Sequence, residues 1–325
     1  MDFELTDDQT ALQEGVQQFC AGRFPIDVVR NMETTGGLDR ARWTELAEMG
    51  VFSLRLPEAD GGVGLGMADA VLAFEELGRA IVPGPLVWTH LVAGLVDGAA
   101  TGEVVVTGLD RTDRSQLVEY PDHVDVVMVV DEAGVWRVDR SALELAPVTL
   151  PLDPLVPVGR IVGTGLPQGT RLLDGAGAER IVREGAVLTA ALLLGISSAA
   201  TDLSVAFSKE RVQFGRPIGQ FQALKHLMAD MVVRTEVARG AVYAAGVTID
   251  DPLVGSVPRA VGAAKITAGQ AAVENAKTSI QVHGGMGYTW EVDAHLHLKR
   301  AYVLDAAFVD RDTCAEQMAD LLDAL

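Results

Sequence analysis

Apolar residues recur at helical spacing through the first part of the chain. In the stretch TDDQTALQEGVQQFCAGRF, leucine, valine and phenylalanine lie three or four residues apart, as they would on one face of a helix. Thr6 precedes them as an N-cap, with acidic residues in the first turn. Residues 39–52 and 67–81 repeat the pattern, and each stretch ends near a glycine that suits a C-cap. The pattern predicts an N-terminal helical domain over residues 1–100.

The pattern changes after about residue 100. The runs GEVVVTGL, VDVVMVV and GVWRVDR are short, rich in β-branched residues and separated by Asp, Gly and Pro. Such runs are typical of strands, because branched side chains pack well on a pleated surface. We therefore predict a small β domain over residues 101–176.

From about Ala178 onward the apolar spacing is again that of helices. Four long segments are separated by QFGRPIG, TIDDPLVGSVP and GGMGYTW, and they cover residues 179–211, 220–247, 258–283 and 292–324. Helices of this length with short connections favour an antiparallel bundle. The predicted fold is therefore mainly α with a small β domain, and residues 177–325 form its four-helix bundle.

The charge and cysteine content narrow the choice of partner and compartment. A net charge of −19 argues against nucleic acid or an anionic membrane surface, both of which attract clustered Lys and Arg. Cys20 and Cys314 are too few and too far apart for a disulfide framework or a zinc site. The start MDFELTDDQT lacks the pattern of a signal peptide, and we find no apolar run long enough to span a bilayer. These features lead us to expect a cytoplasmic protein.

Two familiar cofactor patterns do not fit the sequence. In PEADGGVGLG the third glycine of a dinucleotide fingerprint would fall on Met67, and a helix precedes it where a strand is required. A di-iron site in a helical bundle needs Glu-x-x-His motifs, which the sequence lacks. His295 and His297 are two apart on a helix and face different sides, so they do not form a metal site together.

Three stretches together resemble the acyl-CoA dehydrogenase family. RLPEADGGVGLGMADAVLAFEELGRA resembles the family's N-terminal loop and helix, ERVQFGRPIGQFQALKHLMADM its later signature, and QVHGGMGYTWE its glycine motif. The resemblance runs over nearly the whole chain, and the last two motifs taken together are quite specific. It implies the family's fold, FAD as cofactor, and α,β-dehydrogenation of an acyl-CoA thioester.

The resemblance also implies a set of cofactor-binding residues. Arg211 would bond the pyrophosphate of FAD, Phe214 would lie against the cofactor, and Gln222 would lie nearby. The adenosine and pyrophosphate side would be lined by Gln281, Val282, His283, Gly284 and Gly285. The residue types suit this role, because a guanidinium fork matches a diphosphate and glycines let the backbone approach it. The alternative for Arg211 is a helix C-terminal charge that compensates the helix dipole.

The sequence departs from the family in the β domain. The family's Thr-Glu-Pro loop and Trp-x-x-x-Gly strand, which hold the flavin ring, have no counterpart between GEVVVTGL and VDVVMVV. The chain therefore resembles the smaller subunit of heteromeric acyl-CoA dehydrogenases, some of which act on steroid side-chain thioesters. The partner would be a longer paralogue or a second copy of the chain in a dimer or tetramer. The electron acceptor would be of the electron-transfer flavoprotein type.

The catalytic base is the second departure. The family's C-terminal Tyr-Glu-Gly turn is replaced by LDAAFVDRDTC, and the resemblance to other branches puts the base at or next to Asp250. In that reading the chain is a homomeric enzyme with Asp250 as its base. Alternatively, Asp250 and Asp251 form the turn before Pro252. A third reading is a non-catalytic scaffold subunit, which would have no use for a pyrophosphate-binding motif.

Overall fold

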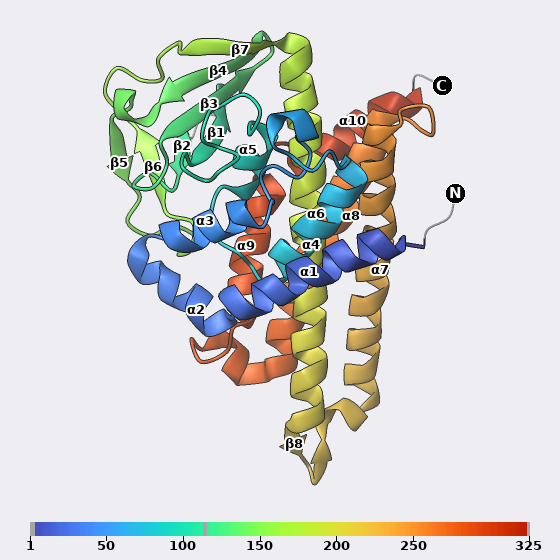
Figure 1. Ribbon diagram of the computed structural model, residues 1–325. Coiled ribbons are helices and arrows are strands. Elements are labelled where there is room, and N and C mark those ends of the chain that lie inside the picture. Colours follow the sequence, from blue (N-terminus) through green and yellow to red (C-terminus); the bar gives the residue numbers. More distant parts are fainter. Residues whose placement is uncertain (1–3, 113–115, 324–325) are drawn as a thin grey trace. The chain divides into compact units, whose positions relative to one another are not determined.

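The computed structural model describes residues 4–112 and 116–323, and most of these are helical (Figure 1). The chain forms two compact units. The first unit combines the segment up to Ile26 with Val71–Val82 and the chain from Ala186 onward, and the second consists of Asp27–Ala70 and Pro83–Gly185. These borders differ from the expected boundaries near residues 100 and 176, which stay a prediction.

The N-terminal third is helical, as the apolar spacing indicates. Its helices are α1 (Asp7–Arg23), α2 (Ile26–Asn31), α3 (Arg40–Glu48), α4 (Met67–Arg79) and α5 (Leu86–Leu91). Thr6 caps α1 in a capping box, since its side chain accepts from Gln9 N and the Gln9 side chain accepts from Thr6 N. The predicted cap is therefore confirmed.

The end of α4 differs from the prediction. Gly78 is not a C-cap but lies inside the helix, and the chain turns at Ile81, which has a left-handed φ of 43°. A Cβ on Gly78 would overlap the carbonyl oxygen of Leu192 on α6 (Gly175–Glu210), and a Cβ on Gly195 of α6 would overlap that of Glu75. The two glycines thus allow α4 and α6 to cross with their backbones in direct contact.

The β region contains two small sheets. One has the order β1-β3-β4-β7, in which β1 and β3 are parallel, and the other the order β2-β6-β5. The strands are β1 (Val106–Asp110), β2 (Leu117–Glu119), β3 (Val126–Asp131), β4 (Gly134–Asp139), β5 (Leu145–Pro147), β6 (Val158–Ile161) and β7 (Thr170–Asp174). The three predicted runs correspond to β1, β3 and β4. Inward residues of this sheet, including Val126, Met128 and Val135, pack with Val92 and Ile181 in one buried cluster.

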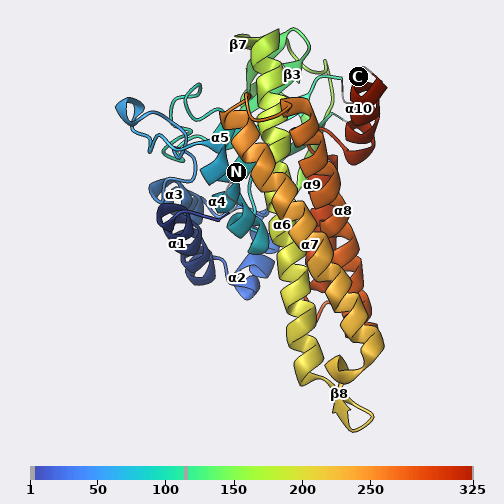
Figure 2. The same cartoon turned by 90° about the vertical axis from the view of Figure 1, so that its right-hand side faces the viewer.

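The C-terminal half is helical, and Figure 2 shows its long helices running together. Besides α6 they are α7 (Gln222–Asp250), α8 (Val257–His283), α9 (Ala294–Ala306) and α10 (Arg311–Asp323). The fourth predicted segment is therefore two helices. The break falls at Phe308, which has a φ of 61°, and Asp310 then caps α10 by accepting from Thr313 N at 2.9 Å.

A buried polar network joins α6, α7 and α8. Asn275 of α8 donates to Ser197, to Thr201, to Thr235 and to the carbonyl oxygen of Met231, at 2.8–3.2 Å. Its own oxygen accepts from Arg234 at 2.8 Å. Because buried polar groups are costly when unpaired, these bonds favour one register of the three helices.

A second buried network includes a charged pair. Glu75 of α4 is fully buried, and its carboxylate accepts from Arg239 of α7 and, at 2.8 Å, from the Tyr243 hydroxyl. Burial and, next, the Glu75 charge raise the pKa of Tyr243, which keeps the phenol protonated and donating. This pair connects α4 to the bundle within the first unit.

Helix α6 is apolar along most of its length. By length and composition alone this 36-residue helix could cross a membrane, so the expectation that no apolar run is long enough to span a bilayer does not hold for α6. Of its most apolar window, however, 83% is buried inside the structure. The core position of α6 thus accounts for its hydropathy.

Candidate functional site

The turn between α6 and α7 is a two-stranded hairpin. Its strands are β8 (Val212–Gln213) and β9 (Arg216–Pro217), followed by a 3-10 turn over Ile218–Gln220. Phe214 and Gly215 at the tip have φ of 53° and 78°, the left-handed pair of a type I′ hairpin. A bulky aromatic is uncommon in this conformation. Phe214 is nonetheless 92% exposed and meets Phe221 edge to face at 6.1 Å.

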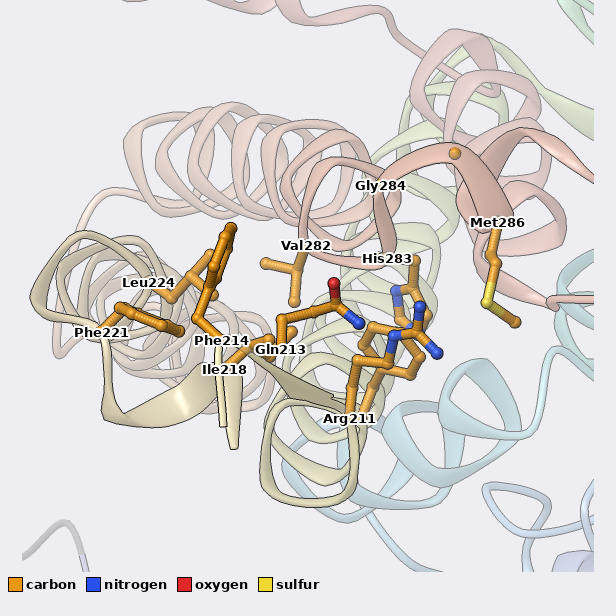
Figure 3. A pocket seen from close by; sticks show the side chains of 12 residues that line it. Arg211, Gln213, Phe214, Ile218, Phe221, Leu224, Val282, His283, Gly284 and Met286 are labelled. Atoms are coloured by element: carbon orange, nitrogen blue, oxygen red, sulfur yellow. The ribbon is translucent and has the colours of Figure 1, made fainter. Parts of the chain in front are cut away.

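The hairpin closes one side of a pocket of about 680 Å³. The end of α6 and the hairpin, the start of α7, the end of α8 and the 3-10 turn η5 (Gly284–Tyr288) all contribute to it (Figure 3). Its lining residues are Phe207, Arg211, Gln213, Phe214, Ile218, Phe221, Leu224, Val282, His283, Gly284, Gly285 and Met286. The signature and the glycine motif, about 70 residues apart in sequence, thus meet at one site.

Most of the predicted cofactor residues lie together here. Arg211, Phe214, Val282, His283, Gly284 and Gly285 all line the pocket. Gln222 and Gln281 are not among the lining residues, and both are exposed. The assignment of these eight residues to FAD stays a prediction.

Several lining residues were not foreseen from the sequence. Phe207 lies one turn before Arg211 on α6, and Phe221 and Leu224 lie at the start of α7. Their spacing is that of ordinary core positions, so nothing in the local pattern sets them apart. Gln213 and Met286 lie within the two motifs, so their position in these motifs is a sequence signal for both residues.

The ionisable groups of the pocket are both basic. Among its described lining residues only Arg211 and His283 carry ionisable side chains, in a chain whose net charge is −19. The His283 ring stacks on Phe207, with centroids 4.2 Å apart and planes 29° apart. Its Nδ1 lies 2.7 Å from the carbonyl oxygen of Ser279. A carbonyl oxygen only accepts, so Nδ1 is the donor in this bond.

The glycine motif leaves room at the pocket wall. Gly284 has φ 61° and ψ −138°, a backbone conformation that residues with a Cβ rarely adopt. A Cβ added at Gly284 or Gly285 would meet no described atom within 4 Å. The space, the aromatic faces and the two basic groups fit the adenine and diphosphate of FAD, in which flat rings accompany two negative charges.

Asp250 lies outside this pocket. It is the last residue of α7, whose first turn lines the pocket, and 29 residues separate the helix ends by roughly 40 Å at the usual rise. Asp250 is exposed, and the neighbouring Asp251 accepts from Leu253 N at 3.1 Å as a turn-forming residue. The predicted catalytic role of Asp250 stays a prediction.

Sequence comparison identifies the family. The model described as "Acyl-CoA dehydrogenase, N-terminal domain" matches residues 6–104, and the one described as "Acyl-CoA dehydrogenase, C-terminal domain" matches residues 177–307. The chain belongs to the acyl-CoA dehydrogenase family. This assignment confirms the predicted family, fold class and enzyme class, an oxidoreductase that acts on the CH–CH bond of an acyl-CoA. It also supports FAD as the cofactor.

Individual relatives match over nearly the whole chain. It is 33% identical over 316 residues to "Acyl-CoA dehydrogenase IpdE2" of Mycolicibacterium smegmatis, a match over 92% of this chain and 93% of the relative. The solved structure of the "Tcur3481-Tcur3483 steroid ACAD G363A variant" has a TM-score of 0.85 at 23% identity and covers 98% of both chains. The "ChsE4-ChsE5 complex from Mycobacterium tuberculosis" has a TM-score of 0.85 at 21% identity and covers 100% of both chains. At these identities the two structures show a shared fold.

Proposed function

We propose that this acyl-CoA dehydrogenase chain is one subunit of a heteromeric enzyme that dehydrogenates an acyl-CoA thioester at Cα and Cβ. Its contribution is the pocket that holds the ADP part of FAD. The observation that carries the proposal is the pocket itself, where Arg211 and His283 face a space bounded by glycines and aromatic rings. An acidic chain that gathers two basic groups without a carboxylate among the described lining residues is suited to an anion.

The chain's own residues would hold the cofactor in three ways. The Arg211 guanidinium would donate two parallel hydrogen bonds to the diphosphate. Gly284 and Gly285 would let it approach the backbone, and Phe207 and Phe214 would offer ring faces to the adenine. When bound, FAD accepts the β-hydrogen as hydride while a carboxylate removes the α-proton.

A partner is required because the chain lacks the family's flavin-ring loop and strand. A longer acyl-CoA dehydrogenase paralogue would supply these contacts and the catalytic carboxylate. The outer face of α7 is suited to such a partner, since Val232, Val233 and Val237 are 47%, 62% and 57% exposed. This helix starts at the pocket and lies in front of α6 and α8 in Figure 2. Exposed apolar faces of this kind mark protein interfaces.

A charge on this face should weaken assembly with the partner. The double substitution Val233→Asp and Val237→Asp is expected to weaken association with the partner by at least about tenfold, because each carboxylate would lose its water in the interface. Size-exclusion chromatography and sedimentation velocity of the mixed subunits measure this. Leu253→Asp, at a 96% exposed position beyond the end of α7, is the matched control. Unchanged assembly of the double variant would contradict binding of the partner at this face of α7.

The role of Asp250 separates the heteromeric from the homomeric reading. In the heteromer the base lies on the partner, so Asp250→Asn should leave turnover of the assembly within about threefold, under 1 kcal/mol in the barrier. If Asp250 is the base of a homomeric enzyme, turnover should fall by about 10²–10⁴-fold. Asparagine keeps the size and the turn-forming capacity of aspartate. A difference in turnover therefore reports the loss of the carboxylate and not a change in folding. Stopped-flow reduction of the flavin, with flavin content as control, distinguishes the two results.

For the substrate class we favour a thioester derived from a steroid. The support is the solved structure of the same fold that is named a "steroid ACAD". The acceptor would be an electron-transfer flavoprotein, and the cytoplasm remains the expected location. Comparing kcat/KM for a steroid-derived CoA thioester with that for octanoyl-CoA tests the substrate class, and equal values would contradict it.

A further inference from the structure

We propose that the exposed side chains of Tyr288 and Trp290 form a second docking surface for the longer paralogue, on the side of the pocket away from α7. We call these two side chains the aromatic flank. The inference rests on the proposed function, because it takes the same heteromeric partner. It goes further in assigning part of the partner's binding to a segment that belongs neither to α7 nor to the pocket lining.

The aromatic flank begins where one wall of the pocket ends. The turn η5 supplies Met286 to the pocket, Tyr288 is the last residue of η5, and Trp290 follows two positions later. Figure 3 shows Met286 at one end of the pocket and Leu224 of α7 at the other. A subunit that covers the whole pocket from α7 therefore also contacts the aromatic flank.

The exposure of these rings sets them apart. Tyr288 is 83% exposed and Trp290 is 59% exposed. The other three tryptophans lie deeper, since Trp43 and Trp136 are buried and Trp88 is half-buried. Tyrosine and tryptophan are enriched at the energetic centres of protein interfaces, because a large ring gains much on burial and has few torsions to immobilise.

The aromatic flank is held in place within the chain itself. Thr289, between the two rings, closes a turn in which its N and its Oγ1 both donate to the carbonyl oxygen of Met286, at 2.9 and 2.7 Å. The Lys299 ammonium lies 4.2 Å from the centroid of the Trp290 ring, and the His295 ring meets that ring edge to face at 4.6 Å. A surface that is ordered in advance loses little conformational entropy on association.

The area that a stable complex buries favours an interface larger than the α7 face. Specific complexes bury about 800 Å² on each partner. The half-exposed valines of α7 offer only on the order of 200 Å² together. Each ring of the aromatic flank adds roughly 100–200 Å². The partner therefore needs contacts on both sides of the pocket.

The longer paralogue fits this position better than a second copy of the chain. In the proposed enzyme the two ends of FAD are held by different subunits, so the subunit that holds the flavin ring lies against the ADP pocket. This sequence lacks the family's ring-binding loop and strand. A second copy would bring no such contacts to the pocket, whereas the paralogue would.

Fluorine NMR of the full chain labelled with 5-fluorotryptophan tests the position of the partner. The chain has four tryptophans, and Trp290→Phe identifies the Trp290 resonance. Addition of the unlabelled paralogue with FAD should move this resonance and remove most of its shift between H₂O and D₂O. The resonances of Trp43 and Trp136 should keep their positions, because both rings are already buried.

A double variant measures the contribution to affinity. Tyr288→Ala combined with Trp290→Ala should weaken association with the paralogue by at least about thirtyfold, the size of a hot-spot truncation. Leu150→Ala, at a 90% exposed position between β5 and β6, is the control and should change the Kd by less than about twofold. Sedimentation velocity measures the Kd, and circular dichroism checks that each variant is folded.

The outcomes separate the two proposals. If the paralogue assembles with the chain and holds FAD, but the Trp290 resonance does not move and the double variant binds normally, the aromatic flank is overturned and the proposed function stands. A Trp290 resonance that moves with the concentration of the chain alone would show a second copy at this surface and would also overturn the inference. If no longer paralogue assembles with the chain, both proposals fail. A moved resonance together with weakened assembly of the double variant supports both.

Discussion

Replacing Arg239 with methionine is expected to lower the free energy of unfolding by about 3–5 kcal/mol, the range for breaking one side of a buried ion pair. Glu75 is fully buried, and Arg239 is its charged partner. Removal of the guanidinium leaves a buried carboxylate without its ion-pair partner, although the Tyr243 hydroxyl still donates to it. Methionine retains most of the volume, so the loss reports the charge more than the packing. Urea denaturation followed by circular dichroism measures it.

A second variant isolates the charge of Glu75. Glu75→Gln combined with Arg239→Met should recover a large part of the loss, because the neutral amide can still accept from Tyr243. Arg216→Met serves as the matched control, since Arg216 is exposed on the hairpin and lies over the Phe221 ring. Equal destabilisation by Arg216→Met and Arg239→Met would contradict a special role for the buried pair.

Arg211→Ala is expected to weaken FAD binding to the assembled enzyme by about 2–5 kcal/mol, as losing a charge-assisted contact to a buried partner does. That corresponds to roughly 30-fold to several thousandfold in Kd. The stability of the flavin-free chain should change little, because Arg211 is exposed and follows the end of α6. Fluorescence titration with FAD measures the affinity, and thermal unfolding measures the stability.

The same hairpin offers the control for this experiment. Arg216→Ala removes an arginine that does not line the pocket, so FAD affinity should be nearly unchanged. If the flavin-free protein instead loses stability in Arg211→Ala while its FAD affinity holds, Arg211 is a structural charge at the helix end. The alternative based on the helix dipole would then be correct.

Local signals in the sequence were sufficient where one residue determines the local structure. Thr6 and Gln9 form a capping box because each side chain reaches the other's backbone within a single turn. The strands β1, β3 and β4 are rich in β-branched residues, and each is at least five residues long. The three-residue strands β2 and β5 are too short to produce such a pattern.

Features that depend on contacts between distant residues could not be predicted from the local sequence. Gly78 has the sequence context of a C-cap, but its function is the close approach to Leu192, more than 100 residues away. The break at Phe308 contains neither glycine nor proline. The same limit applies to the pocket, because motifs identified Arg211 while Phe207 enters it only through the meeting of α6 with α8.

The flavin content of the purified chain tests the central claim most directly. The chain alone is expected to carry little FAD, because it has the ADP pocket but lacks the family's ring-binding loop. Co-purified with a longer acyl-CoA dehydrogenase paralogue from a neighbouring reading frame, it should contain about half a flavin per chain, one for each pair of unlike subunits. Absorbance at the flavin bands against protein concentration gives both values. One tightly held FAD per chain without a partner would contradict the account.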